Sequence, residues 1–161
     1  MSTIEARLES LGLQLPAPVK LPAGVVLGFP WVRIHGERAI VSGHGALNAD
    51  GSIAPLLGKV GKDLTLEQGY HAARLTGLAI LSSLKAELGD LDRIAAWLRA
   101  YGMVNTAEGF TNYPQVINGF TDLIFELFGP DRGRHARSAV GMAGLPFGLA
   151  VEIEAEVAIS G

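Results

Sequence analysis

The sequence predicts an α+β domain in which one mixed sheet carries two long helices on the same face. Residues 151–159 alternate between apolar and acidic side chains, which is the period of a strand with one buried face. Residues 65–89 and 114–128 instead repeat their apolar side chains at helical spacing. Strand-like segments before, between and after these helices indicate a layered arrangement, whose open sheet face we expect identical subunits to cover.

Residues 1–24 are expected to form an arm ahead of a domain of residues 25–161. Apolar side chains at helical spacing predict a short helix over residues 2–11, with Thr3 as its cap. Leu15-Pro16-Ala17-Pro18 cannot continue a helix and predicts an extended linker. We expect this arm to pack on the outside of the domain or on a neighbouring subunit.

Three short apolar segments predict strands at the start of the domain, with a turn at Gly36-Glu37. The glycine- and Asx-rich residues 43–51 predict a loop. Their glycines lack the spacing of a phosphate-binding loop, which argues against a mononucleotide site. The three predicted strands are residues 25–27, 31–34 and 38–42.

The two helices have recognisable ends. Thr65 and the glutamine three residues later form a capping box, and Gly89 closes the first helix. After a predicted strand at residues 94–104, Pro114 opens the second helix, and we expect Gly129-Pro130 to end it.

The chain is expected to close with a hairpin. Its parts are a strand at residues 138–140, a turn at 145–148 and the alternating strand at 151–159. The polar loop before it contains Arg132-Gly133-Arg134-His135. This loop is either simply solvated or available to an acidic ligand or an RNA phosphate.

The composition favours a cytoplasmic oligomer. Hydrophobic residues make up 48% of the chain and charged ones only 18%, against about 25% in an average soluble domain. No stretch approaches the ~20 apolar residues of a membrane-spanning helix. The absence of cysteine excludes thiol nucleophiles, disulfides and cysteine-ligated metals. A net charge of −3 argues against tight nucleic-acid binding.

One stretch carries a resemblance to a known family. Residues 136–140 read Ala-Arg-Ser-Ala-Val, and after Leu145-Pro146 the chain continues with Val-Glu-Ile-Glu-Ala at residues 151–155. This resembles the closing signature of the reactive-intermediate deaminase family (Rid, YjgF-like). Val41-Ser42-Gly43 and residues 89–94 are similar to further family segments.

The resemblance implies a chorismate-mutase-like fold assembled as a homotrimeric barrel, with active sites in the clefts between subunits. It also implies hydrolysis of 2-imino or 2-enamine acids to 2-oxo acids and ammonia without a cofactor. An older label of the family is endoribonuclease L-PSP. The arm of residues 1–24 resembles a longer branch of the family.

Arg137 and Glu152 are the expected catalytic residues. A guanidinium matches a carboxylate in a planar, two-pronged geometry, and by resemblance Arg137 holds the substrate carboxylate. Glu152 matches the family residue that positions the attacking water. The alternatives are an ion pair of Arg137 with Glu152 or Glu154 on a neighbouring strand, and an edge hairpin that simply exposes its acidic residues to solvent.

Trp31, Ser42, His44 and Asn118 are further expected substrate-binding residues. Trp31 and His44 replace the tyrosine and the glutamine that are frequent in the family, and Ala139 replaces a frequent cysteine, so the pocket wall differs. The four histidines lack metal-binding spacing, and no metal is expected.

Three functions therefore remain at this point. The first is a deaminase that is similar to 2-iminobutanoate/2-iminopropanoate deaminases. The second is a trimer that binds a small carboxylate metabolite without turnover. The third is an endoribonuclease, which the net charge of −3 disfavours.

Overall fold

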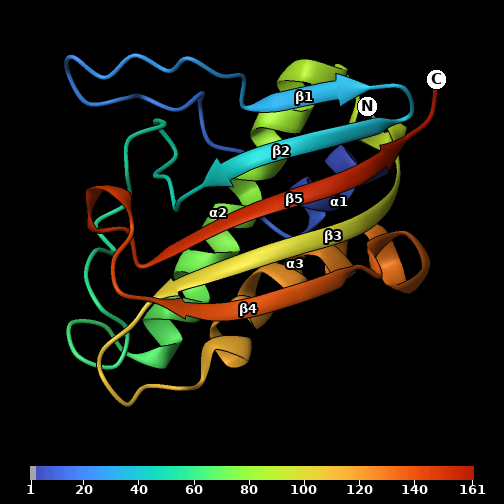
Figure 1. Ribbon diagram of the computed structural model, residues 1–161. Coiled ribbons are helices and arrows are strands. Elements are labelled where there is room, and N and C mark those ends of the chain that lie inside the picture. The colour runs from blue at the N-terminus through green and yellow to red at the C-terminus, as the bar shows by residue number, and fades with distance from the viewer. Residues whose placement is uncertain (1–2) are drawn as a thin grey trace.

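The computed structural model describes residues 3–161 and confirms a mixed α+β fold (Figure 1). Five strands form one sheet in the order β1-β2-β5-β3-β4, and the helices α2 and α3 lie behind one face of it. The elements are α1 (Thr3–Ser10), β1 (Val32–His35), β2 (Arg38–His44), α2 (Leu66–Leu88), the short 3-10 helix η1 (Leu91–Arg93), β3 (Ile94–Asn105), α3 (Tyr113–Gly133), β4 (Ala136–Met142), the 3-10 helix η2 (Pro146–Gly148) and β5 (Val151–Ile159).

The expected closing hairpin is wrong, although both of its strands exist. β5 lies in the middle of the sheet, antiparallel to β2 on one side and to β3 on the other. β4 pairs in parallel with β3 and forms the edge of the sheet. The side chains of a central strand with one buried face alternate in the same way as those of an edge strand. The two-residue period therefore does not show whether a strand lies at the centre or at the edge of a sheet.

The core lies between the sheet and the two long helices. The capping box at Thr65 is present, and the helix closes at Gly89 in the left-handed conformation, with φ 78°. α2 and α3 approach closely at Gly119, where a Cβ would collide with the backbone oxygen of Tyr70. Trp97 of β3 is buried on the face of the sheet that the two helices cover. Its ring packs edge-on against Phe120 and Phe128 of α3.

Two boundaries differ from the sequence prediction. Residues 25–27 form no strand: the N–H of Val25 donates back to the carbonyl oxygen of Pro22 at 3.1 Å, and Val26 is 90% exposed. α3 continues to Gly133 beyond the expected stop, across a kink at Gly129, where φ is 73°. Pro130 begins the final turn of α3. An N–H at the first position of a turn has no partner within the helix, so the missing N–H of proline costs little there.

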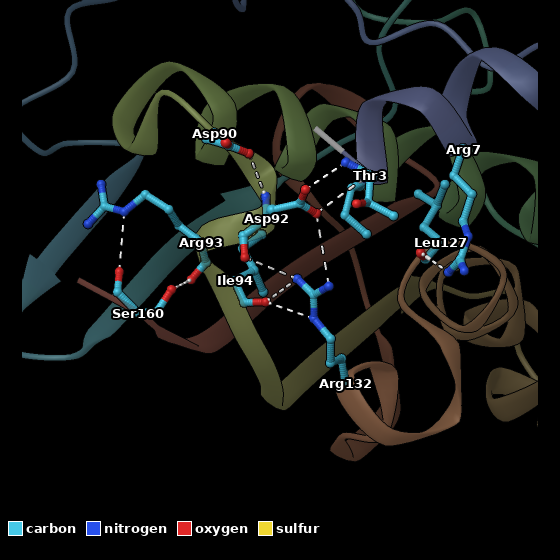
Figure 2. A network of polar contacts seen from close by, with 10 residues as sticks. Thr3, Arg7, Asp90, Asp92, Arg93, Ile94, Leu127, Arg132 and Ser160 are labelled. Carbon is cyan, nitrogen blue, oxygen red and sulfur yellow. Dashed lines mark hydrogen bonds and ion pairs between the residues drawn. The ribbon is translucent and has the colours of Figure 1, made fainter. Parts of the chain in front are cut away.

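The first helix packs on the body of the same chain (Figure 2). The backbone N–H of Thr3 donates to the carboxylate of Asp92 of η1 at 2.6 Å, so the start of α1 is bound by a side chain from another element. Arg7 donates to the carbonyl oxygen of Leu127 at 2.8 Å. Ile4 is 1% exposed and belongs to the main core. Ser2, where the predicted helix was to begin, lies outside the described residues.

Arg132 belongs to the same network and holds the end of α3 (Figure 2). Its guanidinium donates to the carbonyl oxygen of Ile94 at 2.6 Å and to that of Asp92 at 3.2 Å. Within residues 3–161, no helix combines the length and apolar character that crossing a membrane requires.

Candidate functional site

Arg137 lies on the edge strand β4 and points toward α3. Its Nη1 donates to Thr121 Oγ1 at 2.9 Å, and its Nη2 donates to the carbonyl oxygen of Pro114 at 3.2 Å. A guanidinium has five N–H donors, so three of them have no hydrogen-bond partner among residues 3–161. Burial lowers the pKa of Arg137, and Asp122 acts in the opposite direction. The side chain is therefore oriented on one side and still able to bind an anion.

His135 fixes the hydroxyl that holds Arg137. His135 Nδ1 lies 2.8 Å from the carbonyl oxygen of Gly133, which only accepts, so Nδ1 carries the proton. His135 Nε2 then accepts from Thr121 Oγ1 at 3.1 Å. Burial lowers the pKa of His135, with a smaller contribution from Arg137, and this favours the neutral ring. The hydroxyl consequently directs its lone pairs to Arg137.

Glu152 lies at the start of β5 and lines a cavity of about 220 Å³. Its side chain is half-buried, and no hydrogen bond or ion pair joins its carboxylate to another side chain of residues 3–161. Burial, followed by the nearby charge of Glu154, raises the pKa of Glu152. A desolvated carboxylate without a partner can orient a water molecule or accept a proton from it.

Gly43 provides the room for this carboxylate. A Cβ at Gly43 would collide with Glu152 Oε2. A bulge in β2 between Val41 and His44 changes the register here, so that both of these side chains are buried while Gly43 faces Glu152. The backbone of β2 thereby forms one wall of the cavity.

His44 and Trp31 form another wall of the same cavity. Their ring centroids are 4.8 Å apart. His44 Nδ1 donates to the carbonyl oxygen of Ser42 at 2.6 Å, which leaves Nε2 to accept from Ser83 Oγ at 2.8 Å. Burial lowers the pKa of His44 despite the opposing effect of the Ser42 carbonyl, so the ring is a neutral wall with both nitrogens engaged.

Arg137 and Glu152 belong to opposite faces of the sheet. Arg137 pairs with Ala100, which is fully buried beneath the helices, whereas Glu152 pairs with Met103 on the open face. The alternative ion pair of Arg137 with Glu152 or Glu154 is therefore wrong, since β3 separates the two strands and Arg137 is bound to α3.

The expected site residues thus fall into two groups. Trp31 and His44 line the cavity with Glu152. Ser42 instead lines a neighbouring cavity with Glu154, and its Oγ donates to the carbonyl oxygen of Pro30 at 2.9 Å. Asn118 is on the Arg137 side, one turn from both Pro114 and Thr121 along α3, and is half-buried.

Sequence reasoning missed Thr121 and the arm residues of the cavity. Thr121 follows Pro114 by seven residues and Asn118 by three, so the two polar side chains share a helix face, which is the available signal. In the structure the arm continues without a helix or strand beyond residue 24 to β1, which begins at Val32. The only pointer to the cavity in its sequence is the presence of apolar side chains between Val19 and Phe29. Within residues 3–161, no three His, Asp or Glu side chains gather into a group that could hold a metal ion.

Comparison with known proteins gives related chains along almost the whole length. Protein TCP17 of Trypanosoma cruzi is 40% identical over 157 residues, which cover 98% of this chain and 94% of that protein. The crystal structure of Atu1372, a protein with unknown function from Agrobacterium tumefaciens, has a TM-score of 0.85 and 39% identity over 98% of this chain and 92% of that one.

A “putative endoribonuclease” from Shewanella oneidensis MR-1 has a TM-score of 0.88 at 29% identity, covering 98% of this chain and all of that one. Residues 5–151 match the family described as “YjgF/chorismate_mutase-like, putative endoribonuclease”. The match includes the closing signature up to Val151 and most of the arm. The chain therefore belongs to the YjgF/chorismate mutase-like family.

Proposed function

We propose that the protein hydrolyses 2-imino or 2-enamine acids to 2-oxo acids and ammonia, at a site to which two subunits contribute. The observation that carries this proposal is the pair of incompletely satisfied charges, Arg137 with free N–H donors and Glu152 with a free, half-buried carboxylate. One anchors a carboxylate and the other directs water, the two tasks that imine hydrolysis needs.

The two groups have to come from different copies of the chain. Arg137 faces α3 and Glu152 faces the open side of the sheet, so one substrate cannot reach both within one subunit. The edge position of β4 leaves Arg137 accessible to a neighbour. A closed homotrimer brings the edge of one subunit to the cavity of the next, and we include this assembly in the proposal.

The reaction balances with water alone. The substrate carboxylate binds Arg137, and a water oxygen held by Glu152 attacks the iminium carbon while Glu152 takes a proton. The resulting carbinolamine receives this proton on its nitrogen. Its C–N bond then breaks, and the hydroxyl proton leaves with the nitrogen. One iminium and one water thus give one 2-oxo acid and one ammonium ion.

RNA cleavage receives less support. Of the two arginines at the end of α3 and just before β4, Arg132 donates to two backbone carbonyls and is engaged within the fold, which leaves Arg134 as the exposed one. Phosphate-binding surfaces need several free cations side by side. The net charge of −3 provides no such excess.

The test measures 2-oxo acid formed from freshly generated 2-iminobutanoate, above the uncatalysed rate. The wild type is expected to accelerate the reaction, and Arg137→Ala to abolish the acceleration. Arg134→Ala is the matched control, because this nearby arginine is exposed and outside the site. An unchanged rate in Arg137→Ala would refute the assignment of Arg137. A well-assembled wild type without acceleration would instead favour the trimer that binds a small carboxylate without turnover.

A further inference from the structure

We propose that the extended arm between Val19 and Phe29 forms a side-chain pocket, which makes the protein selective for 2-imino acids with large apolar side chains. This inference rests on the proposed function, since the pocket opens beside Glu152. It adds the class of substrate and assigns Phe29 as a specificity-determining residue.

The cavity at Glu152 is apolar over most of its wall. Its polar side chains are those of Glu152, His44 and Lys20. The arm contributes aliphatic and aromatic groups from one side, and the segment around η2 contributes from another. The apolar lining residues are Val19, Leu21, Pro22, Val25, Leu27, Phe29, Trp31, Ala46, Leu47, Ile53, Pro146, Phe147 and Leu149.

The arm is held in place over this cavity by backbone contacts. The N–H of Ala17 donates to the carbonyl oxygen of Ala49, and that of Lys20 donates to the carbonyl oxygen of Gly51, both at 2.9 Å. At the other end, the ring of Phe29 packs edge-on against Trp31, with centroids 6.0 Å apart. Trp31 in turn contacts His44. The arm is thus held near both ends of its cavity-lining stretch.

Two aromatic rings stand in the cavity wall without being buried. Phe29 and Phe147 are each 52% exposed. Phe147 also has φ 56°, a left-handed conformation that a bulky side chain rarely adopts. An apolar ligand that displaces water from these rings removes apolar surface from water, which favours its binding.

The size and chemistry of the cavity select the occupant. A volume of about 220 Å³ is below the ~300–1,000 Å³ of sites for drug-sized ligands, so it suits one metabolite rather than a coenzyme. Glu152 places the reacting carbon at the polar end. The remaining apolar space then receives the side chain, and a leucine- or methionine-sized group fills it better than a methyl group.

The experiment compares imines generated in place by an amino acid oxidase from alanine and from leucine. The wild type is expected to show about tenfold or higher kcat/KM for the leucine-derived imine, the range that added methylenes provide in an apolar pocket. Phe29→Ala should lower this value about tenfold, and the value for the alanine-derived imine by less than about threefold. Val26→Ala is the matched control, because Val26 belongs to the same arm, is 90% exposed and does not line the cavity.

A second measurement needs no turnover. Calorimetry should detect tighter binding of 4-methyl-2-oxopentanoate than of pyruvate, with a difference that Phe29→Ala removes. If neither imine is hydrolysed but this selective binding holds, the proposed activity fails and the pocket stands. If both imines are hydrolysed without preference, or if Phe29→Ala changes only the subunit assembly measured by light scattering, the pocket proposal is overturned and the activity stands.

Discussion

The surroundings of Arg137 form hydrogen bonds with its charged group, whereas those of Glu152 form none. Arg137 is held by Thr121 and Pro114 of its own chain, which fix its direction and leave N–H donors free. Glu152 has no such support, and burial beside Glu154 raises its pKa. Burial disfavours both charges, but only the charged group of Arg137 is oriented by hydrogen bonds within its own chain.

This difference has a functional meaning. A residue that anchors a carboxylate needs a defined direction and a permanent charge, which a supported guanidinium provides. A residue that handles water and protons needs a pKa nearer to the working pH, which desolvation provides for a carboxylate. In the proposed reaction, each region is therefore suited to one of the two tasks, and the substrate connects them.

One of the two largest expected effects comes from removing the two-pronged geometry of the anchor. Arg137→Lys keeps the charge but cannot form parallel hydrogen bonds with a carboxylate, so we expect kcat/KM for 2-iminobutanoate to fall about 100-fold. The measurement is the rate of 2-oxo acid formation. Full activity in Arg137→Lys would mean that a point charge is sufficient and that the orientation by Thr121 is irrelevant.

Glu152→Gln is expected to lower kcat by a factor of about 10² where the wild type is most active, because it removes the proton acceptor. In the wild type, activity should fall as the pH decreases through the pKa of Glu152, and this limb should lie above the ordinary 4.5 of a glutamate. The pH–rate profile of both proteins measures this. An acid limb that persists in Glu152→Gln would assign the titration to another group.

Thr121→Val tests the support of Arg137 without touching a charge. The loss of one hydrogen bond to a charged group corresponds to about 1.5–3 kcal/mol. Because the carbonyl oxygen of Pro114 still holds Arg137, we expect the lower end of this range, roughly a tenfold lower kcat/KM. Thr121→Ser restores the hydroxyl and should recover most of the activity. If valine and serine have the same effect, the hydroxyl does not position Arg137 and the change is one of packing.

The smallest expected effect is an increase in the free energy of unfolding of Glu152→Gln, a variant that loses activity. Because the pKa of Glu152 is raised in the folded state, its contribution to stability is present at low pH and is lost as the pH rises through that pKa. Glu152→Gln should therefore be more stable than the wild type at neutral pH, and this advantage should shrink in acid. Thermal unfolding at several pH values measures the difference, and an advantage that grows in acid would contradict it.

Much of the fold could be predicted because its signals are local. The capping box at Thr65, the glycine at position 89 and the alternation of residues 151–159 each mark an element that the structure contains. Strand order is not local. The central place of β5 depends on its pairing with both β2 and β3, and a one-sided alternation is the same at the edge and in the centre.

The site was predictable only in part for a similar reason. The resemblance singled out Arg137 and Glu152, but residue spacing cannot show that they face opposite sides of the sheet. The approach of the arm to Glu152 also depends on long-range backbone contacts, such as that between Ala17 and Ala49. No periodic pattern encodes such a contact.

The most direct test of the shared site combines two inactive variants in one assembly. Arg137→Ala and Glu152→Gln subunits, unfolded and refolded together in equal amounts, form mixed rings. If each site takes Arg137 from one subunit and Glu152 from its neighbour, a random ring has both residues intact at about a quarter of its sites. We predict recovery of about a quarter of the wild-type activity. No recovery from well-assembled mixed rings would contradict the account, because it would place both residues in the same subunit's site.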